Sequence, residues 1–382
     1  MKQIILRKRN FLLILIPLGI ILNEWAKSSA FIAEEIFAKR IYKVISQAIG
    51  FLTGWIPFSL AELIVAVGPC IIVGLLIRQI IRVIRVKKTI SEDSQNSIGQ
   101  LRFQLIMTAV QNILCLVSVI FFVYILLCGI NYHRYSVQYY LGLSVENSSV
   151  EELEGLLMEL AQKANELRSN LTTENEEGVY ILPMSKKELG QEAKQAYKNL
   201  AKEYEIFKGS YSAPKPVFFS KLMSYTQITG IFTCWTMEAN VNIDISPYSI
   251  GSTMCHELAH LRGFMREDEA NYISYMACLA SDCIDLQYSG TMLALIHTGN
   301  ALYRKDANRY AEVYLNYYSE AVVRDLVANN KYWDKFEETK VAETAEKVND
   351  TYLKVNNQTD GTQSYGRMVD LLLAEYRQRQ KK

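Results

Sequence analysis

The sequence predicts an α+β protein that is mostly α-helical, in which N-terminal transmembrane helices precede a domain with a small antiparallel sheet. Three observations support this class. Long apolar runs occur only in the first third of the chain, and helical periodicity covers most of the remainder. Short runs rich in β-branched and aromatic residues cluster between residues 217 and 245. We therefore divide the chain into a membrane domain, 1–132, and a soluble domain, 133–382.

The charge distribution supports this division. The chain of 382 residues has 41 Lys and Arg against 40 Asp and Glu, and this net charge of +1 excludes a strongly basic nucleic-acid-binding protein. Residues 1–130 hold 14 basic and 6 acidic residues, whereas residues 131–382 hold 27 and 34. The first part is therefore basic and apolar, and the second is acidic and long enough to bury a core.

Apolar runs predict about three transmembrane helices. Phe103–His133 contains no Asp, Glu, Lys or Arg and exceeds the roughly 20 residues that cross a bilayer as a helix. Ser59–Ile80 predicts a second span, and Lys43–Ile56 before it predicts an interfacial or re-entrant segment. Asn10–Asn23, behind a basic N-terminus, predicts the first span; the alternative is a signal peptide cleaved near residues 28–30.

The loop between the second and third spans indicates the orientation in the membrane. It is rich in basic residues: Arg78, Arg82, Arg85, Lys87, Lys88 and Arg102 outnumber Glu92 and Asp93. By the positive-inside rule this loop is cytoplasmic, so we expect a multi-pass protein of the cell membrane whose C-terminal domain is extracytoplasmic. A nucleic-acid-binding patch is the alternative, but basic loops beside spans are common and no aromatic residues are interleaved.

Capping signals and β-rich runs predict the elements of the soluble domain. Ser148 with Glu151 and Ser185 with Glu188 fit capping boxes, which predict helices over 149–169 and 186–206. An antiparallel sheet is predicted from Val217–Phe219, Gly230–Thr236 and Asn240–Ile245. From Ser249 onward the pattern is helical, with breaks expected near Gly263, Ser289–Gly290, Gly299, Asn329–Asn330 and Asn356–Gly361.

One short motif carries chemistry. His256-Glu257-Leu258-Ala259-His260 has the pattern HExxH, in which two His four residues apart face one side of a helix and reach one metal ion. Zinc fits best, because imidazole and carboxylate ligands that leave a position open form catalytic zinc sites. Glu257 is then placed as general base for a water that zinc activates. The alternative is a pair of core-packing His, which is disfavoured because the chain has only 4 His.

The third ligand is predicted from the residues after the motif. His260 and Gly263 begin the HxxGxxH spacing of the metzincin zinc peptidases, but Arg266 occupies its last position and cannot bind a metal. The next five residues match the pattern E-x-x-[AS]-[DN] of the gluzincins, another group of zinc peptidases. That match makes Glu267 the third ligand and Asn271, one turn later, the residue that orients a ligand His. Glu269 remains the alternative ligand, and a solvated acidic helix start is the non-functional interpretation.

Substrate contacts are predicted from the same resemblance. Gluzincins place an edge strand beside the active helix, where an extended substrate pairs with it. The run from Asn240 to Asp244 is the candidate, with Asn240 and Asn242 as substrate-binding residues, although an ordinary buried strand is an equal alternative. Candidate donors to the oxyanion of the reaction are Tyr365, Arg367 and His297.

Taken together, the apolar spans, the strand GIFTCWTMEANVNID, the block HELAHLRGFMREDEAN and the tail SYGRMVDLLLAEY resemble a bacterial family catalogued as domain of unknown function 3810. The resemblance covers nearly the whole chain and implies a membrane-anchored, zinc-dependent, gluzincin-like metallopeptidase domain of unknown substrate. We expect peptide or protein substrates outside the cytoplasm, contact with the lipid membrane and no nucleic acid. The alternative function is a non-catalytic, zinc-containing membrane sensor or binding protein, which would not need Glu257 as a base.

Overall fold

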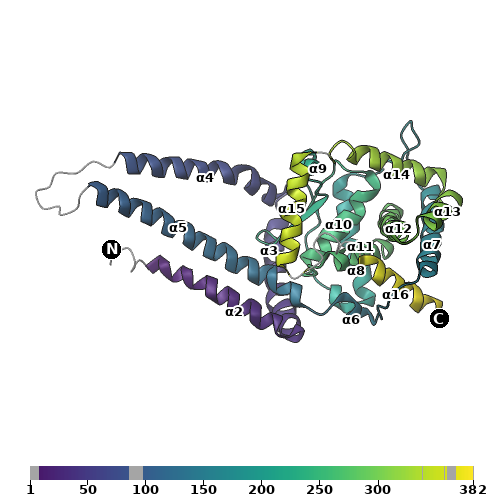
Figure 1. Ribbon diagram of the computed structural model, residues 1–382, viewed down its shortest axis with the longest axis horizontal. Coiled ribbons are helices and arrows are strands. Elements are labelled where there is room, and N and C mark those ends of the chain that lie inside the picture. Colours follow the sequence, from purple (N-terminus) through teal and green to yellow (C-terminus); the bar gives the residue numbers. More distant parts are fainter. Residues whose placement is uncertain (1–7, 86–97, 338, 357, 359–366, 382) are drawn as a thin grey trace, which may run out of the picture.

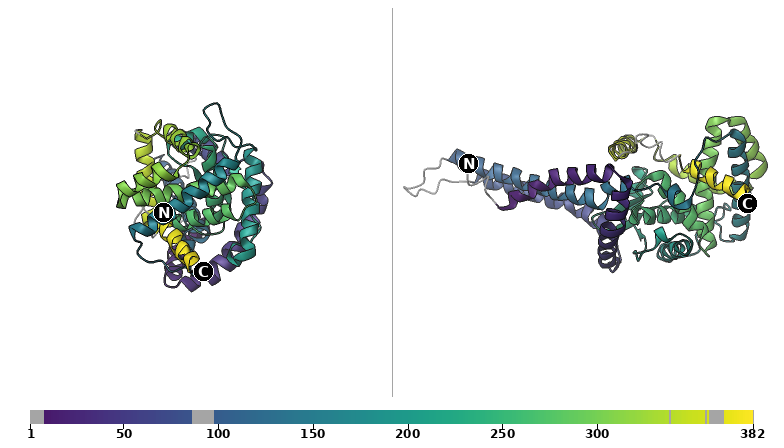
Figure 2. Two further views of the ribbon diagram at one scale, coloured as in Figure 1. Left: turned by 90° about the vertical axis from the view of Figure 1, so that its right-hand side faces the viewer. Right: turned by 90° about the horizontal axis from the view of Figure 1, so that it is seen from below.

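The computed structural model describes residues 8–85, 98–337, 339–356, 358 and 367–381. This part of the chain is mostly helical and contains one three-stranded sheet. Long helices project from one side of a rounded helical domain (Figure 1), and the right-hand view of Figure 2 shows them running together as a bundle. The predicted mostly helical α+β class is therefore confirmed.

Among the described residues, three helices are long and apolar enough to cross a membrane: Arg9–Lys27, Leu60–Ile84 and Ile98–His133. They contain α2 (Leu15–Lys27), α4 (Leu60–Ile84) and α5 (Ile98–Leu127), and they coincide with the three predicted spans. The most apolar part of the α4 span is only 6% buried, as expected of a surface that lipid covers. These features are consistent with association with a membrane.

The predicted interfacial segment forms a separate element at the base of this bundle. The π-helix η2 (Ile32–Tyr42) follows α2, and α3 (Lys43–Gly54) packs against the sheet before the chain enters α4. Tyr42, at the junction of η2 and α3, is buried and donates from its hydroxyl to the carbonyl oxygens of His260 and Leu261, at 3.2 and 3.1 Å. The segment between the first two spans therefore packs against the domain that carries the HExxH motif.

The helices that open the soluble domain lie close to their predicted positions. α7 (Val150–Asn170) begins with a capping box of Ser149 and Glu152, so the predicted box of Ser148 and Glu151 is wrong by one residue. The reason is that Ser148 is engaged elsewhere, because its oxygens accept hydrogen bonds from Lys305. α8 (Lys186–Glu203) has the predicted box of Ser185 and Glu188 but ends three residues early.

The sheet is mixed rather than antiparallel. Its strands are β1 (Lys215–Pro216), β2 (Gly230–Thr233) and β3 (Glu238–Val241), in the order β1-β3-β2. β3 is antiparallel to β2 but parallel to β1, because α9 (Ser220–Tyr225) carries the chain across the sheet before the β2–β3 hairpin returns it to the middle. Val217–Phe219, predicted as a strand, instead leads from β1 into α9.

The remainder of the described chain is helical. The helices are α10 (Pro247–Leu261), α11 (Glu267–Leu279), α12 (Ile284–Lys305), α13 (Ala307–Tyr317), α14 (Glu320–Trp333), α15 (Lys340–Val355) and α16 (Met368–Gln380). The break at Gly263 is confirmed, and α15 ends one residue before Asn356, near the break expected there. Residues 357 and 359–361 of that break lie outside the described part of the chain.

The other three predicted breaks are wrong. α12 runs without interruption through Ser289–Gly290 and Gly299, and Asn329–Asn330 lies inside α14. Gly290 marks close packing instead of a helix end, because a Cβ there would lie 2.4 Å from the Cβ of Cys278 on α11. The tight packing of α11 and α12 helps to bury α10, which lies at the centre of the domain between the sheet and α8, α11 and α12 (Figure 1).

Candidate metal centre

A tight chain reversal brings α11 beside the HExxH helix. Gly263 ends α10 with φ +84°, a left-handed conformation that favours glycine. Its N–H donates to the oxygen of His260 at 2.8 Å, and the N–H of Phe264 donates to the oxygen of Ala259 at 3.1 Å. The chain then extends through Arg266, and α11 begins at Glu267. The loop is short, so the first turn of α11 faces the last turns of α10.

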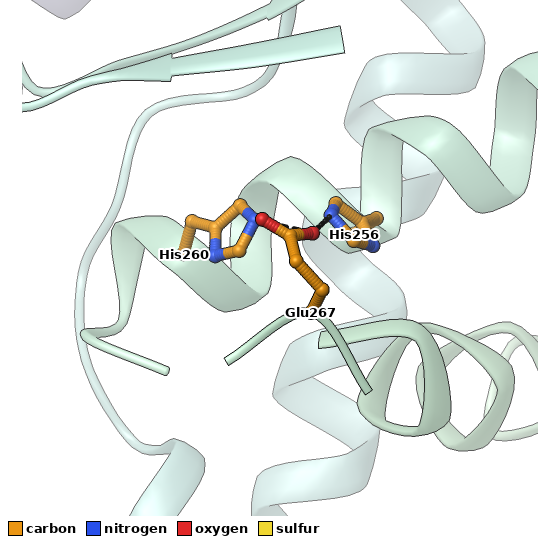
Figure 3. A group of neighbouring side chains, drawn as sticks. All are labelled: His256, His260 and Glu267. Carbon is orange, nitrogen blue, oxygen red and sulfur yellow. Dashed lines mark ion pairs between the residues drawn. The ribbon is translucent and has the colours of Figure 1, made fainter. Parts of the chain in front are cut away.

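His256, His260 and Glu267 converge at this junction. One potential ligand atom from each residue lies within 4.8 Å of the others. Figure 3 shows the Glu267 carboxylate between the two rings, with its Oε2 at 3.1 Å from Nε2 of His256 and 3.6 Å from Nε2 of His260. His260 and Glu267 are buried, and the His256 side chain is 14% exposed. The structure thus gathers the three residues that the sequence predicts as metal ligands.

Each imidazole is oriented by a hydrogen bond to its other nitrogen. Nδ1 of His256 contacts Oδ1 of Asn271 at 2.8 Å, and Nδ1 of His260 contacts the carbonyl oxygen of Phe264 at 2.7 Å. Both partners are acceptors, so each Nδ1 carries the proton in the neutral ring. Each Nε2 then presents a lone pair toward Glu267. Asn271 therefore lies where the orienting residue was predicted.

The ionisable groups where His256, His260 and Glu267 meet favour a positive charge between them. Burial alone would lower the pKa of His260, but the adjacent Glu267 carboxylate, by charge and hydrogen bonding, and Glu257 raise it to about 9. Burial alone would raise the pKa of Glu267, yet the charges and hydrogen bonds of His260 and His256 hold it far below its ordinary value. Two lone pairs and a carboxylate that point at one another are stable only with a proton or a cation between them.

Glu257 lies beside the three converging residues and is only 4% exposed. Burial raises the pKa of this carboxyl, although the charges of His256 and His260 partly oppose the rise. Its Oε1 is packed against β2, where a Cβ on Gly230 would lie 2.4 Å away. Among the described residues no group hydrogen-bonds to its Oε2. Glu257 therefore presents one buried oxygen without a partner next to the candidate metal ligands.

The other two acidic residues in the first turn of α11, Asp268 and Glu269, contact groups other than the two His. Glu269 accepts from the N–H of Val137 at 2.9 Å and pairs with Arg266 at 2.6 Å. Asp268 pairs with Arg367, with 3.4 Å between Oδ2 and Nε. Glu269 is only 4% exposed, so the interpretation of this run as a solvated helix start is wrong. Because it faces Val137 and Arg266, it does not join the His pair.

The predicted substrate strand does not lie at an edge. β3 is the central strand; its Asn240 and the following Asn242, which lies just beyond the strand, are both buried. The Asn240 amide accepts from the hydroxyl of Ser59 at 2.6 Å, and the Asn242 amide donates to the hydroxyl of Ser224 at 2.9 Å. The assignment of both side chains to substrate is therefore wrong, because structural hydrogen bonds occupy them. The edge strand beside α10 is β2, which is short and contains a glycine, so its pattern alone does not reveal its place in the sheet.

The three candidate oxyanion donors have different positions. Tyr365 lies outside the described residues. Arg367 begins α16 and is held by Asp268, the neighbour of Glu267. His297 lies on α12, where burial and then the charge of His256 lower its pKa to about 4. Burial therefore favours the neutral form of His297, which lies close enough to His256 for the charge of His256 to affect it, whereas Arg367 contacts Asp268, the residue after Glu267.

Several supporting residues were missed from the sequence. The Arg134 guanidinium donates to the carbonyl oxygen of Arg262 at 3.0 Å and forms a buried ion pair with Glu34 at 2.8 Å. Arg134 and Tyr42 thus donate to the carbonyl groups that end α10, and Glu34 holds Arg134 in place. The available signal was only that Arg134 directly follows the third predicted span and that Glu34 lies in the segment between the first two. The membrane-proximal segments therefore hold the helix that carries the candidate site.

The comparisons with known proteins assign the chain to a family. The family described as "Protein of unknown function (DUF3810)" matches residues 37–373. The chain belongs to this family. The DUF3810 match extends from η2 to α16 and so includes α4, α5, the HExxH helix and Glu267. No curated protein and no solved structure matches the chain.

Proposed function

We propose that this DUF3810 protein is a membrane-anchored, zinc-dependent metallopeptidase of the gluzincin type. The observation that carries the proposal is the convergence of two Nε2 atoms and a carboxylate oxygen beside a buried glutamate with a partnerless oxygen. We propose zinc as the metal, lipid as one partner and a peptide or protein outside the cytoplasm as the substrate. Family membership alone implies none of these activities.

The donor atoms fit zinc. Two imidazoles and one carboxylate form the ligand set of catalytic zinc sites that keep a further position open. The hydrogen bonds from His256 to Asn271 and from His260 to Phe264 resemble those that orient ligand imidazoles in zinc proteins. Glu267 and Asn271 lie four residues apart on one face of α11, so a single helix supplies both the third ligand and an orienting group.

The residues around the site support hydrolysis. Zinc bound to His256, His260 and Glu267 would supply Lewis acidity, which lowers the pKa of water and polarises a carbonyl group. Glu257 would take a proton from the attacking water on Oε2 and return it to the departing amine. The outer edge of β2, which pairs with no strand among the described residues, would hold the peptide in an extended form by main-chain hydrogen bonds.

Glu257 also favours a peptidase over a non-catalytic zinc sensor. Leaving a buried polar atom unpaired costs about 1–3 kcal/mol. A sensor or a structural zinc site gains nothing from an acid at this position, whereas hydrolysis requires a base there. An acid with an unpaired buried oxygen at this position therefore fits a role in hydrolysis better than a purely structural role.

Metal content and hydrolysis measured on one set of variants test the proposal. We expect purified wild type to contain about one zinc per chain and to cleave a fluorogenic peptide library. Glu257→Gln should keep zinc and lose about 10²–10⁴-fold in rate, whereas His256→Ala and His260→Ala should lose both zinc and activity. Glu203→Gln, an exposed position at the end of α8, is the matched control. Undiminished cleavage by Glu257→Gln would refute the peptidase proposal and favour the sensor.

A further inference from the structure

The first turn of α4 is hydrogen-bonded directly to the sheet that flanks the candidate site. Ser59 caps α4, accepting from the N–H of Glu62 at 2.9 Å and donating to Oδ1 of Asn240 at 2.6 Å. The carboxylate of Glu238 accepts from the N–H groups of Leu60 and Ala61, at 3.1 and 2.9 Å. Residues 238 and 240 share one face of β3, so this face of the sheet lies against the start of the α4 span.

The same turn of α4 also fixes α9. The Glu62 carboxylate accepts from the N–H groups of Phe218 and Phe219, at 3.0 and 2.6 Å. These residues lead into α9, which Figure 1 places beside the N-terminal end of α4. The start of α9 therefore lies at the same height along the helical bundle as the start of the α4 span.

Large apolar side chains are exposed at this level. They are Trp55 (77% exposed), Phe58 (53%), Phe218 (85%), Phe219 (47%) and Leu222 (62%), and we call them the apolar rim. Aromatic residues at the end of a span typically lie in the interface between lipid and water. The rim is also continuous with the exposed apolar surface of α4, where Val65 is 73% exposed. The bilayer that covers α4 is therefore the occupant that fits the rim.

β2 connects this level to the site. Gly230 and Phe232 face α10: Gly230 lies against Glu257, and the Phe232 ring is 6.5 Å from the ring of His260. Ile231 alternates to the opposite face, opposite Asn240, and is 48% exposed. Adjacent strands lie about 4.8 Å apart, so a peptide paired with the outer edge of β2 would lie two strand spacings, or about 10 Å, from the strand that contacts α4. Such a peptide would therefore lie near the start of the α4 span.

We infer that the apolar rim seats the domain in the bilayer interface and that the site acts on membrane-tethered polypeptides, in the extended stretch next to their anchor. The substrate class rests on the proposed peptidase function, whereas the contact between rim and bilayer does not. A tethered segment diffuses in the plane where β2 lies, so its effective concentration at this strand exceeds that of a free peptide. The site would thus select substrates by tethering more than by sequence.

Fluorescence quenching tests the contact with the bilayer. The full chain would be placed in lipid nanodiscs whose acyl chains carry bromine, in a background without its 4 natural Trp. Trp restored at position 55, or introduced as Phe218→Trp, should be strongly quenched. Leu315→Trp is the matched control, because Leu315 is 77% exposed on α13, at the end of the domain away from the spans (Figure 1). Equal quenching at the rim positions and at position 315 would overturn the inferred contact.

Cleavage of two matched peptide pools tests the substrate class. One pool of random sequence would carry a palmitoyl anchor that inserts into the nanodisc, and the other would be free. We expect wild type to cut the anchored pool at least about tenfold faster, close to the anchor, and Glu257→Gln to cut neither. Equal rates would overturn the tethered substrate while leaving the peptidase proposal intact. No cleavage of either pool would refute the peptidase proposal and the substrate class together, and quenching would still decide the bilayer contact.

Discussion

Glu267 and Glu269 lie two residues apart in the first turn of α11 and make contacts on opposite sides of it. Glu267 lies 3.1 Å from Nε2 of His256, whereas Glu269 accepts a hydrogen bond from the N–H of Val137 at 2.9 Å. Residues two apart on an α-helix differ by roughly 200°, so one turn presents its two carboxylates in opposite directions. One faces the HExxH helix, and the other faces the segment that follows the third span.

This relationship predicts different effects for two substitutions. Glu267→Ala should weaken zinc binding by at least about 100-fold, because it removes a carboxylate ligand. Glu269→Gln should retain zinc, because its contacts are to Val137 and Arg266. Gln is preferred to Ala at position 269 because the position is buried. Competition with a zinc chelator measures both affinities; tight binding by Glu267→Ala together with loss in Glu269→Gln would place the third ligand at residue 269.

Gly230 should control the position of the general base. A Cβ at this residue would lie 2.4 Å from Oε1 of Glu257, so Gly230→Ala must displace that carboxylate. A displacement of about 1 Å costs roughly 100-fold in rate, and we expect that loss of hydrolysis with unchanged zinc content. Gly68→Ala on α4, where a Cβ meets no atom within 4 Å, is the matched control. Full peptidase activity in Gly230→Ala would argue against Glu257 as the base.

The buried pair of Glu34 and Arg134 should make stability depend on pH. Burial alone would raise the pKa of Glu34, but the adjacent Arg134 guanidinium holds it below the ordinary 4.5. Because the folded-state pKa is lowered, the stabilisation is present above 4.5 and is lost as pH falls through the folded-state value. Glu34→Gln should cost about 3–5 kcal/mol at neutral pH, and the difference from wild type should shrink in acid.

Thermal unfolding of the full chain in detergent, followed at several pH values, measures this difference. Glu35→Gln is the matched control, because Glu35 pairs with Lys39 at the surface and such pairs contribute at most about 1 kcal/mol. A constant gap between wild type and Glu34→Gln from neutral to acidic pH would show that ionised Glu34 is not the source of the stabilisation.

The orientation in the membrane gives a further prediction. The C-terminal end of α4 and the N-terminal end of α5 lie at the end of the bundle away from the domain (Figure 1). If the helices span, the loop that joins them and the domain lie on opposite sides of the membrane. Reporter fusions after residue 95 should therefore be cytoplasmic, and fusions after residue 145 extracytoplasmic. The reverse pattern would contradict the proposed location of the substrates.

Features set by local sequence were predicted well. The spans depend on composition within one helix, and the spacing of His256 and His260 fixes their common face. Glu267 and Asn271 were predicted from the match to the gluzincin pattern, whose two residues share one helix face. The one-residue error at Ser148 and Ser149 is of the same local kind, since two adjacent serines each precede a glutamate by three residues.

Features set by distant contacts were not predictable. The middle position of β3 depends on where α9 returns the chain, and no residue pattern within β3 records that crossover. The contact of Tyr42 with His260 joins residues 218 apart, and the pair of Glu34 and Arg134 joins residues 100 apart. Gly290 predicted a helix end, but it serves close packing between helices, which becomes evident only when the neighbouring helix is placed.

X-ray absorption at the zinc edge of the purified full chain tests the central claim most directly. We predict about one zinc per chain with only nitrogen and oxygen neighbours, at about 2.0–2.2 Å, and the same spectrum for Glu257→Gln. A chain purified without zinc that binds none when zinc is added, or a zinc with sulfur neighbours at about 2.3 Å, would contradict a site built from His256, His260 and Glu267.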